Sequence, residues 1–567
     1  MEKRWVYNDP PPEQVVEDLS AGINVNPVLA SILAQRGINT YEDARNYFRP
    51  NLENLLDPFL MKDMDKAVDR LSKAINKREK ILIYGDYDVD GTTSVALVYG
   101  FLKKYNTNLG YYIPDRYKEG YGVSSRGIEY ATENNFSLIV SLDCGIKAVE
   151  KVGKAKESGI DFIICDHHLP GKDLPPAIAI LDPKQQDCPY PFKELSGCGV
   201  GFKLLQAFCQ KNDIPLKELY ESLDLLAVSI ASDIVPIIGE NRILAFYGLK
   251  KLNSNPSAGL NALIEIAGIK KNVNISGIVF GIGPRINASG RIDHAKTVVK
   301  LLTSEDEALA VDLADGINEK NTIRRSYDMN STTEALKMVD DDPLLRDAKS
   351  TVLFNNSWHK GIVGIVAARC VDKYYRPTII LTESNRMATG SARSVDGFNI
   401  YKAIEACSDL LEQFGGHRYA AGLTMKLENV EEFKKKFEEI VCESITDDQR
   451  VPQVEIDQKV TLDKINKKFF NILRQMAPFG PGNMDPVFVA ENLQVSSRPK
   501  VIKEEHLKFF VKQSSGVKTF ECIGFGFAQY FEMLASGMKF NMAFTIEENN
   551  FMGMKSIQLC VKDIKFD

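Results

Sequence analysis

The fold is decided by the stretch ILIYGDYDVDG, which runs from Ile81 to Gly91. Its first part, Ile81 to Tyr84, is a short apolar run bounded by charge and glycine, which is typical of a buried β-strand. The second part places three carboxylates at alternate positions, Asp86, Asp88 and Asp90. Three anions within five residues repel one another. Two divalent cations bound by oxygen ligands would supply the missing positive charge.

Three other interpretations compete with a catalytic metal site. A solvated acidic turn is common, because aspartate is frequent in turns. An EF-hand loop matches the three aspartates and Gly91, but it needs a bidentate glutamate at its twelfth position, which here is Leu97, and it follows a helix and not a strand. A structural ion site without chemistry stays open until the rest of the chain is considered.

The composition predicts a soluble globular protein. The 567 residues suffice for three or four domains, and 44% hydrophobic and 26% charged residues are ordinary values. The net charge of -6 does not indicate a nucleic-acid binder, although a local basic groove is compatible with it. The ten cysteines include no C-x-x-C pair, which favours buried thiols in a reducing cytosol. We find no signal core and no apolar run near the ~20 residues of a membrane span, so we expect a cytoplasmic protein without membrane association.

Residues 81 to about 182 alternate apolar strands with helices, which predicts a doubly wound, mostly parallel α/β sheet. Sites in such sheets form at the carboxyl ends of the strands. Acidic and imidazole side chains follow three of the predicted strands, and one more aspartate follows an apolar helix. An isolated Asp-His-His turn would be ordinary, but the convergence predicts a metal site that suits manganese, with magnesium as the alternative. The candidate residues are Asp86, Asp88, Asp90, Asp143, Asp166, His167, His168 and Asp233.

These motifs resemble those of the DHH phosphoesterase superfamily. Four later segments are similar to the RecJ family of single-stranded-DNA exonucleases and to its DHH-associated domain, and the resemblance covers nearly the whole chain. The segments are GIGPRINASGRIDHA (281–295), WHKGIVGIVAARC (358–370), GSARS (390–394) and GGHRYAAG (415–422).

The resemblance implies two bound ions, Mn²⁺ or Mg²⁺. Asp88 and Asp90 would each bind one ion and Asp143 would bridge both, while His167 and Asp233 would complete the shell of one ion. For Asp86 and His168 the resemblance leaves open direct ligation, support of a ligand, or contact with the substrate.

Substrate-binding residues are expected in two further places beside the metal site. Arg285, Asn287 and Arg291 fall in a glycine-interrupted loop, and the resemblance implies that they contact DNA phosphates across a cleft, although each could be an ordinary surface residue. A terminal-phosphate pocket is expected where a helix opens at 361–364, because free amides, glycine turns and an arginine suit an anion. Its other members would be Ser391, Arg393, Gly416, His417 and Arg116.

The last ~110 residues contain several short β segments with turns between them, which predicts a small barrel of OB type. Basic residues around Phe509 and Phe510, Lys508 among them, suit the backbone and bases of a single strand. A lysine-rich solvated face is the plainer alternative. We therefore expect five parts: an N-terminal helical arm (1–60), a catalytic domain (61–270), a helical connector with a long linking helix (271–345), a smaller α/β DHH-associated domain (346–455) and the OB-type barrel (456–567).

The resemblance implies a metal-dependent exonuclease that degrades single-stranded DNA 5′ to 3′ to mononucleotides, in DNA repair and recombination. It further implies a RecQ-type helicase and a single-strand-binding protein as partners. We also expect a monomer. One alternative is another DHH phosphodiesterase acting on nano-RNA, phosphoadenosine phosphate or cyclic dinucleotides, although so small a substrate gives the barrel no purpose. A DNA-binding scaffold with a decayed site is a third hypothesis, and the complete set of carboxylates argues against it.

Overall fold

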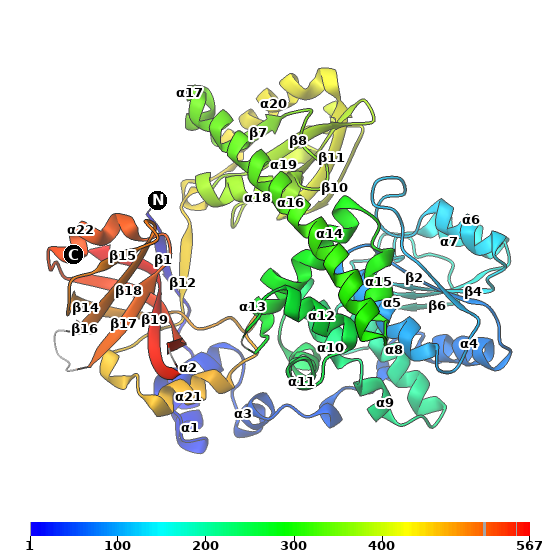
Figure 1. The fold of residues 1–567 in the computed structure, drawn as a ribbon, viewed down its shortest axis with the longest axis horizontal. Coiled ribbons are helices and arrows are strands. Elements are labelled where there is room, and N and C mark those ends of the chain that lie inside the picture. Colours follow the sequence, from blue (N-terminus) through cyan, green and yellow to red (C-terminus); the bar gives the residue numbers. More distant parts are fainter. Residues whose placement is uncertain (1, 271, 514–517, 552, 567) are drawn as a thin grey trace. The chain divides into compact units, whose positions relative to one another are not determined.

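The computed structural model describes residues 2–270, 272–513, 518–551 and 553–566 (Figure 1). The chain forms two compact units. One comprises Met1–Arg45, Arg324–Gln475 and Asp485–Asp567, and the other comprises Asn46–Ile323 and Met476–Met484. We call them the outer unit and the catalytic unit. The long linking helix that the sequence predicts is α16 (Glu307–Asp341), and the boundary between the units falls within it.

The catalytic unit contains the predicted parallel sheet. Its five strands lie in the order β3-β2-β4-β5-β6 and every neighbouring pair is parallel, which confirms the doubly wound arrangement. The strands are β2 (Ile81–Gly85), β3 (Leu109–Tyr112), β4 (Leu138–Leu142), β5 (Asp161–Cys165) and β6 (Ala179–Leu181). All five residues of β2 are buried, as expected for a strand covered on both faces.

Helices cover both faces of this sheet because successive side chains of a strand point to opposite sides. Ile81 and Ile83 pack into the larger core with α4 (Met64–Asn76), α5 (Val89–Leu102) and α8 (Gly197–Lys211). Leu82 and Tyr84 pack into a second core on the other face. That second core is covered by α6 (Ser125–Glu133) and α7 (Val149–Glu157).

The remaining helices of the catalytic unit extend the larger core. They are α9 (Leu216–Tyr220), α10 (Leu223–Ser232), α11 (Gly239–Ser254), α12 (Ala258–Ile266), α13 (Ile275–Gly277), the π-helical turn η3 (Ile278–Ile282), α14 (Gly283–Ile292) and α15 (Lys296–Leu302). The segment that we expected to be a glycine-interrupted loop is therefore helical, and that prediction is wrong. Its glycines serve close packing: a Cβ on Gly290 would lie 2.8 Å from the carbonyl oxygen of Tyr87.

Short helices follow the first strand of the outer unit, in the region where the sequence predicts a helical arm. They are α1 (Glu13–Gly22), α2 (Pro27–Gln35) and α3 (Tyr41–Phe48), and the last of them crosses into the catalytic unit. The Asn26 side chain caps α2 by accepting a hydrogen bond from the amide of Val28, and Pro27 occupies the first turn. Strand β1 (Arg4–Tyr7) pairs in parallel with β12 (Gln453–Ile456).

The smaller α/β domain of the outer unit has the sheet order β10-β11-β9-β8-β7. Strand β7 (Thr351–Phe354) is parallel to β8 (Thr378–Ser384), and β9 (Met387–Arg393), β11 (Ala420–Lys426) and β10 (Gln413–His417) continue the sheet in antiparallel fashion. Its helices are α17 (Pro343–Asp347), α18 (Val363–Tyr374), α19 (Ile400–Glu405) and α20 (Val430–Ser444).

One local expectation for this domain differs from the structure. Glycine turns are expected around Gly416, but Gly416 lies in edge strand β10, where it pairs with Ala421. Ser391 and Arg393 lie within β9.

The C-terminal strands form the predicted OB-type barrel as a partly closed sheet. Their order is β13-β14-β18-β19-β17-β16-β15, and an additional pairing of β14 with β16 brings the sheet back on itself. The elements are β13 (Gln458–Lys459), α21 (Lys467–Gln475), β14 (Phe488–Val495), β15 (Lys500–Ile502), β16 (His506–Gln513), β17 (Thr519–Gly524), α22 (Phe531–Ala535), β18 (Phe540–Phe551) and β19 (Met554–Phe566).

The cysteine and membrane predictions can be compared with the structure. All ten cysteines are free thiols, and only Cys442 is exposed. In the part of the chain that the structure describes, none of the helices has the length and apolar character needed to cross a membrane.

Candidate metal centre

The predicted ligands converge in the catalytic unit, at the carboxyl ends of its strands. Asp86 follows β2, Asp143 follows β4, and His167 lies two residues after the end of β5. Asp233 reaches the same place from the C-cap of α10. Asp143 adopts a left-handed backbone conformation with φ of 58°, which few non-glycine residues adopt and which is frequent at functional sites.

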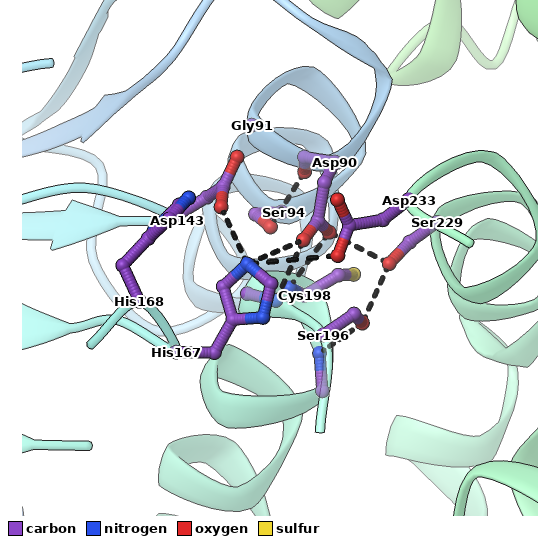
Figure 2. Close-up of polar contacts among 12 residues, drawn as sticks. Asp90, Gly91, Ser94, Asp143, His167, His168, Ser196, Cys198, Ser229 and Asp233 are labelled. Carbon is purple, nitrogen blue, oxygen red and sulfur yellow. Dashed lines mark hydrogen bonds and ion pairs between the residues drawn. The ribbon is translucent and has the colours of Figure 1, made fainter. Parts of the chain in front are cut away.

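The imidazole of His167 lies at the middle of the cluster. Its Nε2 is 3.2 Å from Asp143 Oδ1, 3.6 Å from Asp233 Oδ2 and 3.8 Å from Asp90 Oδ2 (Figure 2). Two sets of side chains have ligand atoms that all lie within 4.8 Å of one another: Asp143, His167 and His168 form one, and Asp90, His167 and Asp233 form the other. The shared imidazole places two candidate ion positions next to each other.

Hydrogen bonding shows that these residues fit a metal ion. Both ring nitrogens of the buried His167 are without a hydrogen-bond partner in the described structure, as is Asp86 Oδ2. Buried polar atoms are nearly always paired, so an imidazole without hydrogen-bond partners that lies among carboxylates indicates a place for a ligand. Carboxylate oxygens combined with imidazole nitrogen are a donor set that suits Mn²⁺ and tolerates Mg²⁺.

Electrostatics support the same conclusion. Burial, and then the charges of Asp90, Asp88 and Asp233, raise the pKa of Asp143 well above its usual range. Burial and the charges of Asp90 and Asp88 do the same to the pKa of Asp233. Carboxylates that resist ionisation because they crowd one another are stabilised as anions by a cation placed among them.

Asp90 is fixed by groups that the sequence analysis did not identify. Its carboxylate accepts hydrogen bonds from the amides of Gly197 (2.6 Å) and Cys198 (2.9 Å) at the N-terminus of α8, and from the Ser229 hydroxyl (2.7 Å). Ser196, which caps α8, is hydrogen-bonded to Ser229 at 2.7 Å. The positive end of the helix dipole favours an anion here. The only signal in the sequence was the Ser-Gly pair typical of a helix start.

The other two aspartates of the quoted stretch are also held by backbone amides. Asp88 caps α5 and accepts a hydrogen bond from Gly91 N at 2.9 Å. Asp86 accepts one from Gly122 N at 3.0 Å. Burial raises the pKa of Asp88, and burial together with the charge of Asp88 raises that of Asp86 well above its usual range.

His168 is oriented by a chain of hydrogen bonds. Its Nδ1 lies 2.7 Å from Asp166 Oδ1, and its Nε2 lies 3.1 Å from the Tyr121 hydroxyl. Asp166 also accepts a hydrogen bond from the amide of Ile146. Burial opposes its ionisation, but the hydrogen bond with His168 lowers the pKa of Asp166 to about 2. Against the effect of burial, the same hydrogen bond raises the pKa of His168.

The sequence did not lead us to one further buried acid, Asp182, whose pKa responds to the charge of Asp166. Asp182 follows β6 just as Asp143 follows β4, and its side chain is fully buried. Asp182 Oδ1 accepts a hydrogen bond from the amide of Lys184 at 2.8 Å, whereas Asp182 Oδ2 has no hydrogen-bond partner among the described residues. Burial and the charge of Asp166 raise the pKa of Asp182 to about 7. Its position after a strand was the available signal.

Helix α14 connects two of the ligand-bearing loops. Near its start, a Cβ on Gly283 would lie 2.9 Å from the hydroxyl of Ser232, the residue before Asp233. Near its end, Gly290 packs on the carbonyl of Tyr87, between Asp86 and Asp88. The predicted substrate residues Asn287 and Arg291 lie half-buried on this helix, and Tyr117 donates a hydrogen bond to the carbonyl oxygen of Arg291.

Arg285 has a structural role that the sequence did not suggest. Its guanidinium donates to Asn318 Oδ1 (3.0 Å), the Gly281 carbonyl (2.7 Å) and the Ile266 carbonyl (3.2 Å). These bonds lie within the catalytic unit, and they support the turn that precedes α14. The guanidinium of Arg116 lies 4.9 Å from the ring centroid of Tyr87, which stands between Asp86 and Asp88 in the sequence.

The residues expected to bind a terminal phosphate lie in the outer unit, except Arg116, which belongs to the catalytic unit. Arg393 Nη1 donates to Ser391 Oγ at 3.1 Å, and a Cβ on Gly364 would lie 2.9 Å from Arg393 Nη2. Arg393 pairs with Ala420, which pairs with His417 on β10. Directly paired residues share a face of a sheet, so Ser391, Arg393 and His417 lie on one face.

The residues of β16 that we expected to bind DNA lie on two opposite faces of the strand, because successive side chains alternate. Phe510 is 40% exposed on β16, whereas Phe509 is 1% exposed and belongs to the barrel core. The expectation that Phe509 contacts bases is therefore wrong, because its ring faces inward. Lys508 shares the outer face with Phe510 and forms an ion pair with Glu521 at 2.5 Å.

The chain matches known proteins in family models and in sequence. Three family models match the chain: "DHH family, N-terminal domain" over residues 80–230, "DHHA1 domain" over 347–443 and "RecJ OB domain" over 456–563. The single-stranded-DNA-specific exonuclease RecJ of Bacillus subtilis is 38% identical over 99% of this chain and 70% of that protein. The protein of the same name from Salmonella typhimurium is 31% identical over 95% and 96% of the two chains.

Solved structures agree with these matches. The crystal structure of RecJ from Thermus thermophilus in complex with Mn²⁺ superposes with a TM-score of 0.86 and 26% identity, and it covers 99% of this chain and 79% of that one. The Mg²⁺ complex of that protein gives a TM-score of 0.79 at 24% identity over 99% and 78% of the two chains, which supports the fold.

Proposed function

The chain belongs to the RecJ family of single-stranded-DNA-specific exonucleases, and we propose that it hydrolyses the terminal phosphodiester of single-stranded DNA with two divalent cations. The observation that carries this proposal is the environment of His167. Its unpaired imidazole lies among the carboxylates of Asp90, Asp143 and Asp233 at the carboxyl edge of a parallel sheet. A buried cluster of that kind is costly unless it holds cations.

We assign Asp88, Asp90, Asp143, His167 and Asp233 as the residues that hold Mn²⁺ or Mg²⁺, with Asp86 supporting them. When bound, such ions polarise a scissile phosphate and lower the pKa of a water molecule, so that attack proceeds at neutral pH. The amides of α8 and the Ser229 hydroxyl hold the Asp90 carboxylate in place. Hydrogen bonds made to a metal ligand by its neighbours in this way fix the geometry of the ligand.

His168 is suited to contact the phosphate itself. Its Nδ1 is committed to Asp166, and the hydrogen bond between them raises the pKa of His168 against the effect of burial. The N–H at Nε2 of a protonated imidazole can exchange the Tyr121 hydroxyl, its partner here, for a phosphate oxygen. Such charge-assisted hydrogen bonds are about twice as strong as neutral ones. Tyr121 limits the rotation of the ring through its hydroxyl.

We propose that the face carrying Ser391, Arg393 and His417 binds the terminal phosphate of the strand. A guanidinium and a hydroxyl 3.1 Å apart can donate to two oxygens of one phosphate. The glycine at 364 leaves the Ser391 and Arg393 side chains uncovered, since a Cβ on Gly364 would lie 2.9 Å from Arg393 Nη2 and 3.0 Å from Ser391 Oγ. Attack from the 5′ end with release of mononucleotides is the polarity that the family resemblance implies.

We assign strand binding along its length to the outer face of the barrel, where Phe510 can stack on bases and Lys500, Lys508 and Lys512 can approach phosphates. Hydrolysis of dinucleotides alone would leave this surface without a purpose. A cytoplasmic role in DNA repair and recombination, together with a RecQ-type helicase and a single-strand-binding protein, is the setting that the family suggests.

The proposal is tested with oligonucleotides labelled at either end, single- and double-stranded, in Mn²⁺ or Mg²⁺. We expect mononucleotides from the labelled 5′ end of the single strand only, and no product after chelation. Asp143→Asn should abolish cleavage and retain strand binding, whereas Asp173→Asn, an exposed loop substitution, should change neither. Equal degradation of the duplex, or activity that survives in Asp143→Asn, would contradict the proposal.

A further inference from the structure

Phe280 is a large aromatic side chain that is 80% exposed. It lies in η3 (Ile278–Ile282), a π-helical turn. An isolated exposed apolar residue is ordinary, but π-helical turns are rare and frequent at functional sites. The surroundings of Phe280 therefore decide whether its exposure has a purpose.

The turn that carries Phe280 is held from several directions. The carbonyl of Gly281, the next residue, accepts a hydrogen bond from Arg285 at 2.7 Å, and the same guanidinium contacts the carbonyl of Ile266 at the end of α12. A Cβ on Gly281 would lie 3.1 Å from Ile269 Cδ1, so the backbone packs closely there. A ring presented on a backbone fixed in this way loses little entropy when it binds a ligand.

The helix that directly follows this turn, α14, packs against the segment that carries Asp233. Gly283, three residues after Phe280, lies against Ser232, where a Cβ would be 2.9 Å from the hydroxyl. Ser232 is the last residue of α10, and Asp233 is its C-cap. Phe280 is thus within one turn of the segment that delivers Asp233 to the cluster.

A second unusual residue lies on that segment. Ile234 follows Asp233 with φ of 60° and is 63% exposed. A β-branched residue in the left-handed region is a genuine outlier, and such strain clusters at ligand-binding sites. Two independent departures from ordinary structure therefore lie close to Asp233 along the backbone: Ile234 directly follows it, and η3 ends immediately before Gly283, which packs on Ser232.

We propose that Phe280 stacks on a nucleobase near the terminal phosphodiester held at the metal centre, and that Ile234 contacts the same nucleotide. This inference rests on the proposed nuclease function and adds the group that binds the base. Every base has an aromatic face, so the contact is independent of sequence. A base stacked and paired within a duplex cannot offer that face, so the contact favours single strands.

The test pairs a protein change with a substrate change in the full-length enzyme. Phe280→Ala is compared with the wild type on single-stranded oligonucleotides that carry one abasic position, moved stepwise through the first nucleotides from the 5′ end. Loss of base stacking corresponds to a decrease of about 5- to 150-fold in kcat/KM. We expect this decrease for wild type at one abasic position, and for Phe280→Ala on the normal strand, but no further decrease when the two changes are combined. Phe280→Trp should restore the rate.

Phe59→Ala is the matched control, since Phe59 is also an exposed phenylalanine of the catalytic unit, at 40%, and we expect no change in kcat/KM. The thermal unfolding midpoint of Phe280→Ala should equal that of the wild type. Additive losses from the abasic position and Phe280→Ala, or an unchanged rate in Phe280→Ala, would overturn this inference while leaving the nuclease function intact. If the wild type does not degrade the normal strand, the proposed function itself fails.

Discussion

Gly197→Ala is expected to disturb the geometry of the metal centre and to destabilise the fold. Gly197 is the first residue of α8, and an added Cβ would lie 2.5 Å from Asp143 Cβ, 2.8 Å from its Cα and 2.9 Å from its Oδ1. Ordinary contacts between carbon atoms are about 3.5–4.0 Å, so roughly 1 Å of movement is required. Two of the three contacts are with the rigid part of the residue, so a rotamer change of Asp143 cannot relieve them.

Either direction of that movement disturbs a metal ligand. If Asp143 moves, its carboxylate leaves the position 3.2 Å from His167 Nε2. If α8 moves, the amides of Gly197 and Cys198 lose their hydrogen bonds to Asp90. We expect about 1–3 kcal/mol of destabilisation from overpacking and a loss of about 10- to 100-fold in Mn²⁺ affinity or activity.

The assay combines urea unfolding with a Mn²⁺ titration of exonuclease activity and of heat release on binding. Gly153→Ala is the control: Gly153 lies within α7, no described atom lies within 4 Å of an added Cβ, and the substitution should stabilise the helix by about 0.5–1 kcal/mol without changing activity. If Gly197→Ala binds Mn²⁺ and cleaves DNA like the wild type, the placement of Asp143 against α8 is not what positions the ligand, and the reasoning is refuted.

Two further predictions address residues outside the direct ligands. The fold raises the pKa of Asp182 to about 7 from about 3.9 in the unfolded chain, so the stability linked to its proton is present below about pH 4 and is lost as the pH rises through about 7. Asp182→Asn should therefore unfold at a higher urea concentration than the wild type at about pH 8. The gain in the free energy of unfolding should reach a few kcal/mol, at about 1.4 kcal/mol per pKa unit, and it should vanish near pH 4. A gain independent of pH would show that the Asp182 carboxylate is not the cause. Phe509→Ala should lower the free energy of unfolding by about 3–5 kcal/mol. Phe510→Ala should leave unfolding unchanged and weaken binding to a long single strand by about 1–3 kcal/mol in a fluorescence titration. If Phe510→Ala unfolds the protein and Phe509→Ala weakens binding, the alternation along β16 is shifted by one residue.

The architecture was predictable because it rests on periodic patterns. Ile81 to Tyr84 form a buried strand, the alternation of strands and helices gives a parallel sheet, and the carboxyl ends of parallel strands meet at one edge. That rule brought together Asp143 and His167, which are far apart in the chain. Alternation also contained information that we did not use: Leu507, Phe509 and Val511 are buried on one side of β16, as a period of two predicts.

The nearest neighbours of the ligands could not be predicted in this way. The donors to Asp90 are more than 100 positions away, on α8 and α10, and they reach it only because both helices pack on α5. Such contacts depend on how helices pack on the sheet, and no local pattern encodes that packing. The same holds for Arg285, whose acceptors lie on three separate segments of the catalytic unit.

By itself, the sequence determined which side chains carry the chemistry and at which edge of which sheet they meet, because strand periodicity and the positions of strand ends are local properties. Only the tertiary structure decided what holds those side chains in place, that Asp182 is buried, and that Phe280 and Ile234 are exposed. Burial and hydrogen bonding are properties of the packed chain, since each depends on atoms contributed by distant segments.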